Sequence, residues 1–342
     1  MPTYSEIGAQ FTHLPVGDNI VWLSNQLRDQ LRKMEALTER PVVVYEANHR
    51  AGQARTSQMS ERDLESFMDV LKGLKGDSLD LILNSWGGSP DAADMIGSYL
   101  RQKFTSIHVY VPLEAMSAAT MLACGASEII MGKHSFLGPI DLQMQFMTPD
   151  GPKFCAAQDV LDQFYKIKSD FTENPQAFWD GPGARYYPDT IIRCENALSY
   201  GQEVAERGLQ EGMFRGEDKA AELATKIAAD LANHQKHRAH ARRLSRTYLE
   251  GLGMKIRHLE EDQQLQNQVL TIHHFCSHWF ETLGSVSKTL QSSQGRFAFD
   301  IDEARCSDVE SAQNMHILLD KLMRETQDTP PGADAPIINR PR

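Results

Sequence analysis

The chain has 342 residues, of which 41% are hydrophobic and 24% charged, a composition typical of a globular protein with a sizeable core. Its formal net charge of −11 argues against nucleic acid or an anionic membrane as a partner. The first residues lack the basic start and apolar run of a signal peptide, and no stretch approaches the roughly 18 apolar residues of a membrane span. We therefore expect a cytoplasmic protein.

Cysteine and histidine spacing predicts neither a metal nor a disulfide framework. The five cysteines are widely separated and form no C-x-x-C pair, so we expect reduced thiols. The stretch "TIHHFCSH" at 271–278 contains side chains with ligand chemistry, but it lacks the glutamate of an H-E-x-x-H motif. We interpret these histidines as packing residues and predict no cofactor.

The first hundred residues predict helices and strands in turn. Apolar residues recur at helical spacing from Asp18 to Leu37, with Asp18 as the candidate N-cap. The β-branched run at 41–49 predicts a buried strand, and a serine-capped helix follows from Ser60. "LDLILNS" predicts a second strand, after which Ser89 and the following proline begin another helix.

This alternation continues through "IHVYVP", a strand, then a helix after Ser117, then the strand "SEIIMG". Strands and helices that alternate through short loops are typical of βαβ units with a mainly parallel sheet. The strands are continuously apolar, which favours helices on both faces of the sheet. The fold class predicted is therefore α/β.

Residues 141–188 show less order, and the rest of the chain is mainly helical. A strong helix resumes at Glu217, and the stretch 242–260 predicts a helix, a glycine turn and a short strand. Residues 262–286 and 308–325 have helical spacing, and the last residues are rich in proline. We predict four parts: an N-terminal helical segment (1–40), a main α/β domain (41–259), a C-terminal helical extension (260–326) and a disordered tail (327–342).

Two strand-to-helix joints carry the residues best suited to chemistry. In "NSWGGSPDAA", Gly87 and Gly88 permit backbone conformations that could direct N–H groups toward a developing oxyanion. In "EAMSAATMLACGA", Ser117 stands at the start of a helix. A serine there is usually only an N-cap. The two joints follow consecutive strands, however, so both should emerge at the edge where parallel sheets place their ligands.

These motifs, followed by "LGPIDLQ", resemble those of the Clp-fold serine peptidases, and in particular the serine dehydrogenase proteinase branch, which is distantly related to signal peptide peptidase A. The resemblance covers roughly residues 42–259 and implies a ClpP/crotonase-like fold. It implies that Ser117 is the nucleophile and that backbone amides form the oxyanion hole (Gly87, Gly88, Ser89 and Ala118). The chain departs from the family at Trp86, where proline is usual, and at Ala119, where glycine is common.

The resemblance leaves the activating base open. Asp141 stands near the place of the usual histidine, and His240 stands thirteen residues before Gly253, near the place of the usual acid. The leading hypothesis is a Ser117–His240–Asp141 triad with exchanged positions, because triads are defined by geometry rather than chain order. Neighbouring histidines provide alternative bases (His234, His237 and His134). A Ser–Lys dyad, with Lys153 as the base, is the second hypothesis.

The function predicted is an ATP-independent serine peptidase that hydrolyses protein or peptide substrates through an acyl-enzyme at Ser117. The resemblance also implies a homo-oligomer. Two alternatives stay open: a catalytically inactive scaffold or binding protein on the same fold, and a crotonase-like enzyme that acts on acyl-coenzyme A.

Overall fold

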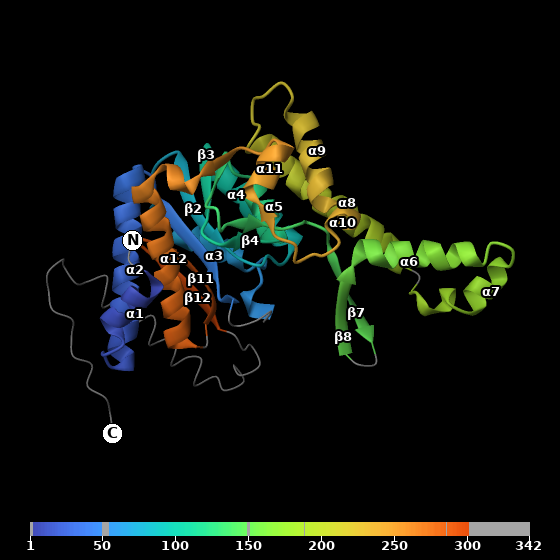
Figure 1. Ribbon diagram of the computed structural model, residues 1–342, viewed down its shortest axis with the longest axis horizontal. Helices are drawn as coiled ribbons and strands as arrows, with labels where there is room; N and C mark the ends of the chain where they lie inside the picture. The colour runs from blue at the N-terminus through green and yellow to red at the C-terminus, as the bar shows by residue number, and fades with distance from the viewer. Residues whose placement is uncertain (1–2, 50–54, 149–150, 188, 285, 301–342) are drawn as a thin grey trace.

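The computed structural model describes residues 3–49, 55–148, 151–187, 189–284 and 286–300 (Figure 1). A seven-stranded sheet forms the centre, in the order β10-β5-β3-β2-β1-β11-β12. The first five strands of that order are parallel, as the alternation of strands and helices predicted. The strands are β1 (Val42–Ala47), β2 (Ser78–Asn84), β3 (Ser106–Val111), β5 (Glu128–Met131), β10 (Ile256–His258), β11 (Val286–Ser292) and β12 (Arg296–Asp300).

Helices cover both faces of the sheet, which confirms the α/β prediction (Figure 1). Alternate residues of β1 serve the two cores: Val43 and Tyr45 face one, and Val42 and Val44 face the other. The first core is covered by α3 (Asp63–Val70), α4 (Pro90–Lys103), α5 (Ala118–Cys124), α8 (Thr190–Glu211), α9 (Ala220–Ala232) and α11 (Arg246–Leu252). The second is covered by α1 (Tyr4–Phe11), α2 (Val16–Thr38) and α12 (Gln263–Leu283).

In the described ranges, the chain before residue 41 and after residue 259 packs on the main sheet and adds strands to it, so two predicted boundaries need correction. Helix α12 packs against α2 over the second core, and β11 pairs with β1 in an antiparallel manner. The prediction of an entirely helical C-terminal extension was wrong, because two strands follow α12 and extend the main sheet. Helix α2 also begins at Val16, so Asp18 lies in its first turn rather than at its cap. The predicted helix at 308–325 and the tail at 327–342 lie outside the described residues.

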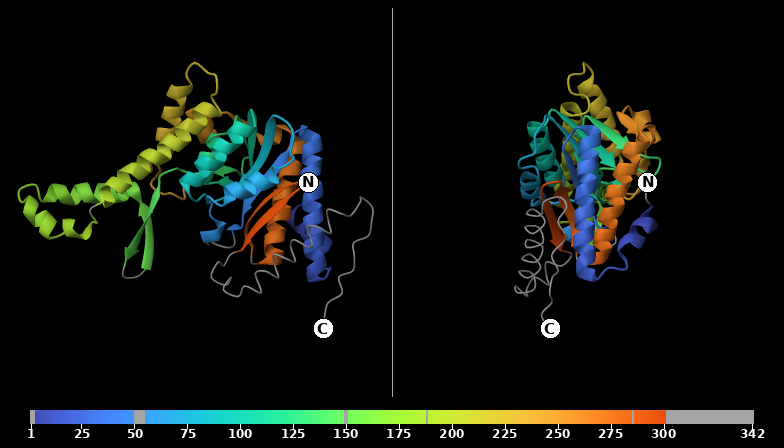
Figure 2. Two further views of the ribbon diagram at one scale, coloured as in Figure 1. Left: turned by 180° about the vertical axis from the view of Figure 1, so that it is seen from behind. Right: turned by 90° about the vertical axis from the view of Figure 1, so that its left-hand side faces the viewer.

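An arm extends from this body between β6 (Phe136–Leu137) and α8, where the sequence showed little periodicity (Figures 1 and 2). It consists of the hairpin β7 (Gln143–Thr148) and β8 (Gly151–Ala156), followed by α6 (Ala157–Asp170) and α7 (Pro175–Asp180). The histidine-rich segment between α9 and α11 contains the short helix α10 (His234–His237). Within the described part of the chain, no helix combines the length and the apolar character needed to cross a membrane.

Candidate active site

Ser117 has a backbone conformation that an ordinary helix cap does not need. Its φ is 52° and its ψ is −120°, far from the left-handed helical region that non-glycine residues with positive φ usually occupy. Its hydroxyl accepts no capping hydrogen bond, whereas Ser89 and Ser245 accept backbone N–H groups at the starts of α4 and α11. Strain of this kind, of order 1–3 kcal/mol, is concentrated at functional sites. The N-cap interpretation of Ser117 is therefore unsupported.

The glycine loop lies directly against this serine. A Cβ added to Gly87 would stand 2.4 Å from the carbonyl oxygen of Met116, 2.7 Å from the amide of Ala118 and 2.9 Å from Cβ of Ser117. Gly87 also has a φ of 91°, which L side chains rarely adopt. Only glycine at this position permits the loop and the serine joint to meet so closely.

Two of the four amides expected to hold an oxyanion are available, and two are already used. The Gly87 N–H donates to Ser85 Oγ at 3.1 Å, and the Ser89 N–H donates to the Met59 carbonyl at 2.9 Å. The N–H groups of Gly88 and Ala118 have no acceptor among the residues that the structure describes. The predicted set of four donors therefore reduces to Gly88 and Ala118.

A change of Gly87 to alanine is expected to damage this joint through a steric clash. The new Cβ would overlap backbone atoms on the serine side, which cannot move aside as a flexible side chain can. We expect a loss of several kcal/mol in the free energy of unfolding, or an active-site loop displaced from its position. Circular dichroism melting and labelling by a serine-reactive probe would measure both effects.

Gly216→Ala provides the matched control, because Gly216 has a similar φ of 81° but no atom within 4 Å of its added Cβ. This variant carries the same conformational strain without the clash. If both variants lost equal stability and equal labelling, the close approach of Gly87 to the serine joint would have no importance.

A small three-stranded sheet brings the predicted triad residues to one end. It consists of β4 (Glu114–Ala115), β6 (Phe136–Leu137) and β9 (Leu244–Ser245). Strands β4 and β6 are parallel, so the residues that follow β4 and those that follow β6 leave the sheet at the same end. Strand β9 is antiparallel to β6, so the residues that precede β9 lie at this end as well. Ser117 and Asp141 follow β4 and β6, and His240 precedes β9. Three distant parts of the chain thus converge.

Asp141 and His240 form a direct hydrogen bond. Nδ1 of His240 lies 2.9 Å from Oδ1 of Asp141, an arrangement that leaves Nε2 as the ring nitrogen available for proton transfer. His234 occupies the other oxygen of the same carboxylate, with Nδ1 at 2.7 Å from Oδ2, and its Nε2 lies 3.1 Å from Asp159. One buried aspartate, 1% exposed, therefore orients two histidines.

These histidines control the charge of Asp141. Burial raises the pKa of this carboxyl group, but hydrogen bonds and charge from His240 and then His234 outweigh burial, and the net pKa is lowered. Stability from this group is therefore present above the ordinary aspartate pKa of about 3.9 and is lost as the pH falls through the lower folded-state value.

We expect Asp141→Asn to lose stability relative to the wild type at pH 6, and the difference to shrink below about pH 4 as the wild-type carboxylate becomes protonated. Urea unfolding at a series of pH values would measure this. A difference that stays constant from pH 6 to pH 3 would contradict the lowered pKa.

The hydroxyl of Ser117 and the ring of His240 are not hydrogen-bonded to each other. Ser117 Oγ makes no hydrogen bond to His240 or to any other residue in the described ranges. Catalytic hydrogen bonds are often long without substrate and tighten in the complex. The strand pairings bring the three segments to one end of the small sheet, and a hydrogen bond between Ser117 and His240 would require side-chain movement.

The alternative bases other than His234 have surroundings of their own, away from the Asp141 carboxylate. Lys153 is exposed on β8, in the hairpin that extends from the body. The His237 ring is buried and its Nε2 lies 2.8 Å from the carbonyl oxygen of Asp230. The His134 ring packs against Gly132, and burial lowers its pKa. His273 and His278 of "TIHHFCSH" interact with Glu46 and with the Tyr4 carbonyl, respectively.

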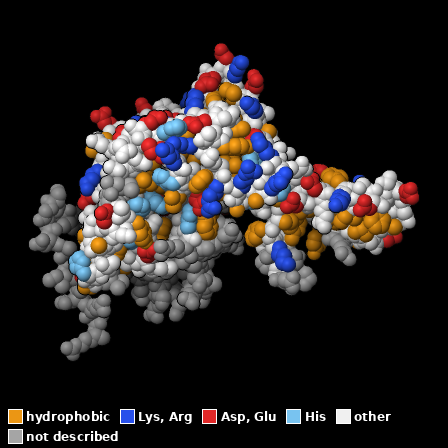
Figure 3. Space-filling view, in the orientation of Figure 1, with side chains coloured by type: hydrophobic (Ala, Val, Ile, Leu, Met, Phe, Trp, Pro, Cys, Tyr) orange, Lys and Arg blue, Asp and Glu red, His pale blue; other side chains and the backbone are white. Residues whose placement is uncertain are grey.

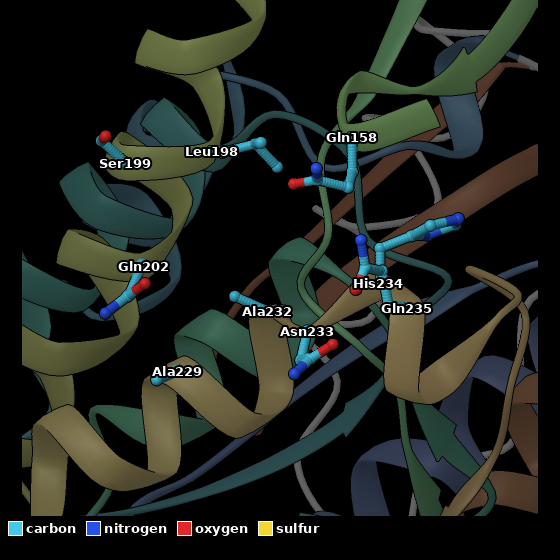
Figure 4. A pocket seen from close by; sticks show the side chains of 9 residues that line it. All are labelled: Gln158, Leu198, Ser199, Gln202, Ala229, Ala232, Asn233, His234 and Gln235. Carbon is cyan, nitrogen blue, oxygen red and sulfur yellow. The ribbon is translucent and has the colours of Figure 1, made fainter. Parts of the chain in front are cut away.

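A hollow of about 400 Å³ lies beside His234, between α6, α8, α9 and α10 (Figure 4). Gln158 and Leu198 face each other across it, and the other polar lining side chains, apart from His234, are uncharged (Ser199, Gln202, Asn233 and Gln235). His234 connects this hollow to the candidate site, since it also bonds Asp141.

Glu114 is a site neighbour that the sequence interpretation did not identify. Its carboxylate contacts Trp86 in the glycine loop and Arg243 in the histidine segment. A signal was present: Glu114 is the one charged residue in the stretch from Val109 to Ser127, which is otherwise uncharged and mostly apolar, and buried charges need partners.

Strained serine, free amides and an oriented histidine–aspartate pair together define a candidate serine hydrolase site. Comparison with known proteins agrees with this class. Residues 59–162 match the family model of the ClpP-like SDH-type serine proteinases, which confirms the resemblance noted in the sequence. The matched segment contains the glycine loop, Ser117 and Asp141, whereas His240 lies beyond it.

Two proteins of Methanocaldococcus jannaschii are similar to parts of the chain. The uncharacterized protein MJ1495 is 26% identical over 159 residues, which are 46% of this chain and 46% of that protein. The uncharacterized protein MJ0137 is 35% identical over 89 residues, which are 25% of this chain and 31% of that protein. The chain thus spans less than half the length of these curated relatives.

Among solved structures, a mutant of the 1510-N membrane-bound stomatin-specific protease is 18% identical in sequence, with a TM-score of 0.25. The aligned region covers 42% of this chain and 72% of that one.

Proposed function

We propose that the protein is an ATP-independent serine peptidase that cleaves protein or peptide substrates through an acyl-enzyme at Ser117. The observation that carries this proposal is the strained, uncapped Ser117 beside two unused backbone amides. A serine needs an adjacent base to act as a nucleophile. We assign that role to His240, which Asp141 holds through Nδ1.

In the acylation step, Ser117 Oγ forms a bond to the carbonyl carbon of the substrate while Nε2 of His240 accepts the hydroxyl proton. The carbonyl oxygen becomes an oxyanion, which the N–H groups of Gly88 and Ala118 stabilise. The C–N bond then breaks, and the proton passes from His240 to the departing amine. Water then attacks the carbonyl carbon of the ester while His240 accepts one of its protons. The bond between Oγ and the acyl carbon breaks, His240 returns the proton to Oγ, and the acid product leaves.

A lysine base is less well supported by the geometry. Lys153 is exposed, and a lysine must lose its proton before it can act as a base, which burial promotes. His240 already has the carboxylate partner that a triad histidine requires. We therefore retain the triad as the proposed catalytic unit.

The proposal includes assembly into a homo-oligomer. Large apolar side chains are exposed on the arm and the adjoining start of α8, which is unusual for a surface that faces only water (Figure 3). They are Phe154, Tyr165, Trp179, Tyr187 and Ile192.

Reaction with a fluorophosphonate probe tests the proposed function. The serine oxygen attacks phosphorus and displaces fluoride, so the label reports an activated serine without knowledge of the substrate. We expect peptide mapping to place the label on Ser117 of the full chain. Native protein that stays unlabelled would contradict a serine peptidase, and tight binding of coenzyme A would then favour a crotonase-like enzyme.

A further inference from the structure

One buried carboxylate joins the three segments of the candidate site. Glu114 lies on β4, three residues before Ser117, and its side chain is 9% exposed. Its backbone is held at the end of β2: its N–H donates to Asn84 Oδ1 at 3.1 Å, and its carbonyl accepts the Ser85 N–H at 2.9 Å. The carboxylate therefore starts from a fixed position.

The first hydrogen bond of the Glu114 carboxylate connects it to the glycine loop. Nε1 of Trp86 donates to Oε1 of Glu114 at 2.7 Å, and Trp86 immediately precedes Gly87. The Trp86 ring also packs against the His49 ring, with 4.7 Å between the centroids. A proline at this position would restrict the backbone directly. Trp86 restricts the loop through its side chain instead.

The second bond reaches the segment that carries the base. Nε of Arg243 lies 2.8 Å from Oε2 of Glu114, and Arg243 follows His240 by three residues. His49 Nδ1 lies 3.2 Å from Oε1. The hydrogen bonds from His49, Trp86 and Arg243 outweigh burial and lower the pKa of Glu114 to about 2, so this group is a carboxylate throughout the neutral range.

We propose that Glu114 is a positioning residue that fixes the Gly87–Gly88 loop and the His240 segment to β4, the strand that leads into Ser117. The two carboxylate oxygens bind different segments. Oε1 holds the glycine loop through Trp86, and Oε2 holds the segment that contains His240 through Arg243. The catalytic consequence rests on the proposed function. The mechanical consequence, a rigid link between the segments, does not.

Amide hydrogen exchange of the full chain tests the mechanical part. We expect Trp86→Phe, which removes the indole N–H donor and keeps a smaller aromatic ring, to speed exchange of residues 85–88 about tenfold while residues 239–243 stay unchanged. Arg243→Gln should show the reverse pattern, and Glu114→Ala should show both. Trp179→Phe and Arg193→Gln are matched controls, because these side chains lie on α7 and α8 and are 53% and 64% exposed.

Kinetics on a peptide substrate tests the catalytic part. Oxyanion contacts strengthen in the transition state, so Trp86→Phe should lower kcat about tenfold and leave KM within about twofold. Glu114→Gln keeps an acceptor for Trp86 and should retain more activity than Glu114→Ala.

The outcomes separate the two proposals. Unchanged exchange of both segments in Glu114→Ala would overturn the positioning role, whether or not the protein is a peptidase. A rise in KM with an unchanged kcat would also overturn it. Altered exchange together with a wild type that neither reacts with fluorophosphonate nor hydrolyses peptides would leave the link intact and refute the peptidase.

Discussion

Ser117→Ala is expected to abolish labelling by fluorophosphonate and to lower peptide hydrolysis by about 10³-fold or more, because the acyl-enzyme can no longer form. The fold should be almost unaffected. The Ser117 hydroxyl caps no helix, so its removal leaves no backbone group without a partner. We expect the melting temperature to stay within about 2 °C of the wild type, because alanine keeps the Cβ of serine and therefore the same backbone conformation.

Ser245→Ala is the matched control for this prediction. Ser245 also precedes a helix, but it has an ordinary φ of −70° and accepts the Tyr248 N–H. Its loss should cost about 1 kcal/mol of stability and leave labelling unchanged. If Ser117→Ala lost stability and was still labelled, Ser117 would be a structural cap. Thermal melting and gel-based labelling of the two variants would measure both quantities.

His240→Ala is expected to have the second large effect. Without its base, Ser117 should lose about 10³–10⁴-fold in acylation rate, since triad members act as a unit. His234→Ala should cost far less, about tenfold, because Asp141 keeps its bond to His240 through the other oxygen. Rates of fluorophosphonate labelling under pseudo-first-order conditions would compare these variants directly.

Lys153→Ala separates this triad from the dyad. The exposed position of Lys153 predicts a labelling rate close to that of the wild type. If His240→Ala kept the wild-type rate while Lys153→Ala lost it, the base would be the lysine and the triad assignment would be wrong. Size-exclusion chromatography of each variant checks that its elution volume matches that of the wild type.

Local sequence signals were sufficient for the parallel part of the sheet. The apolar runs at 42–47 and 79–84 form β1 and β2 because each strand is buried on both faces, and continuous hydrophobicity follows from that burial. The same reasoning failed after residue 260. Helix α12 has a clear helical pattern, but the strand β11 carries polar residues such as Lys288, which is buried against Asp63. A buried ion pair places a charged residue inside a strand, so a search for apolar residues does not recognise that strand.

For the candidate site, too, some features could be predicted from the sequence and others could not. The sequence by itself was enough to propose the serine and the glycine loop as candidates, because a strand-to-helix joint is local and its glycine requirement can be recognised from neighbouring residues. Only the tertiary structure decided which amides remain free, since the Ser89 N–H is taken by Met59, a residue thirty positions earlier. Only the tertiary structure brought His240 to Asp141, across 99 positions, through the antiparallel pairing of β9 with β6. Hydrogen-bond partners distant in the chain depend on strand register, and register follows from the packing of the whole molecule.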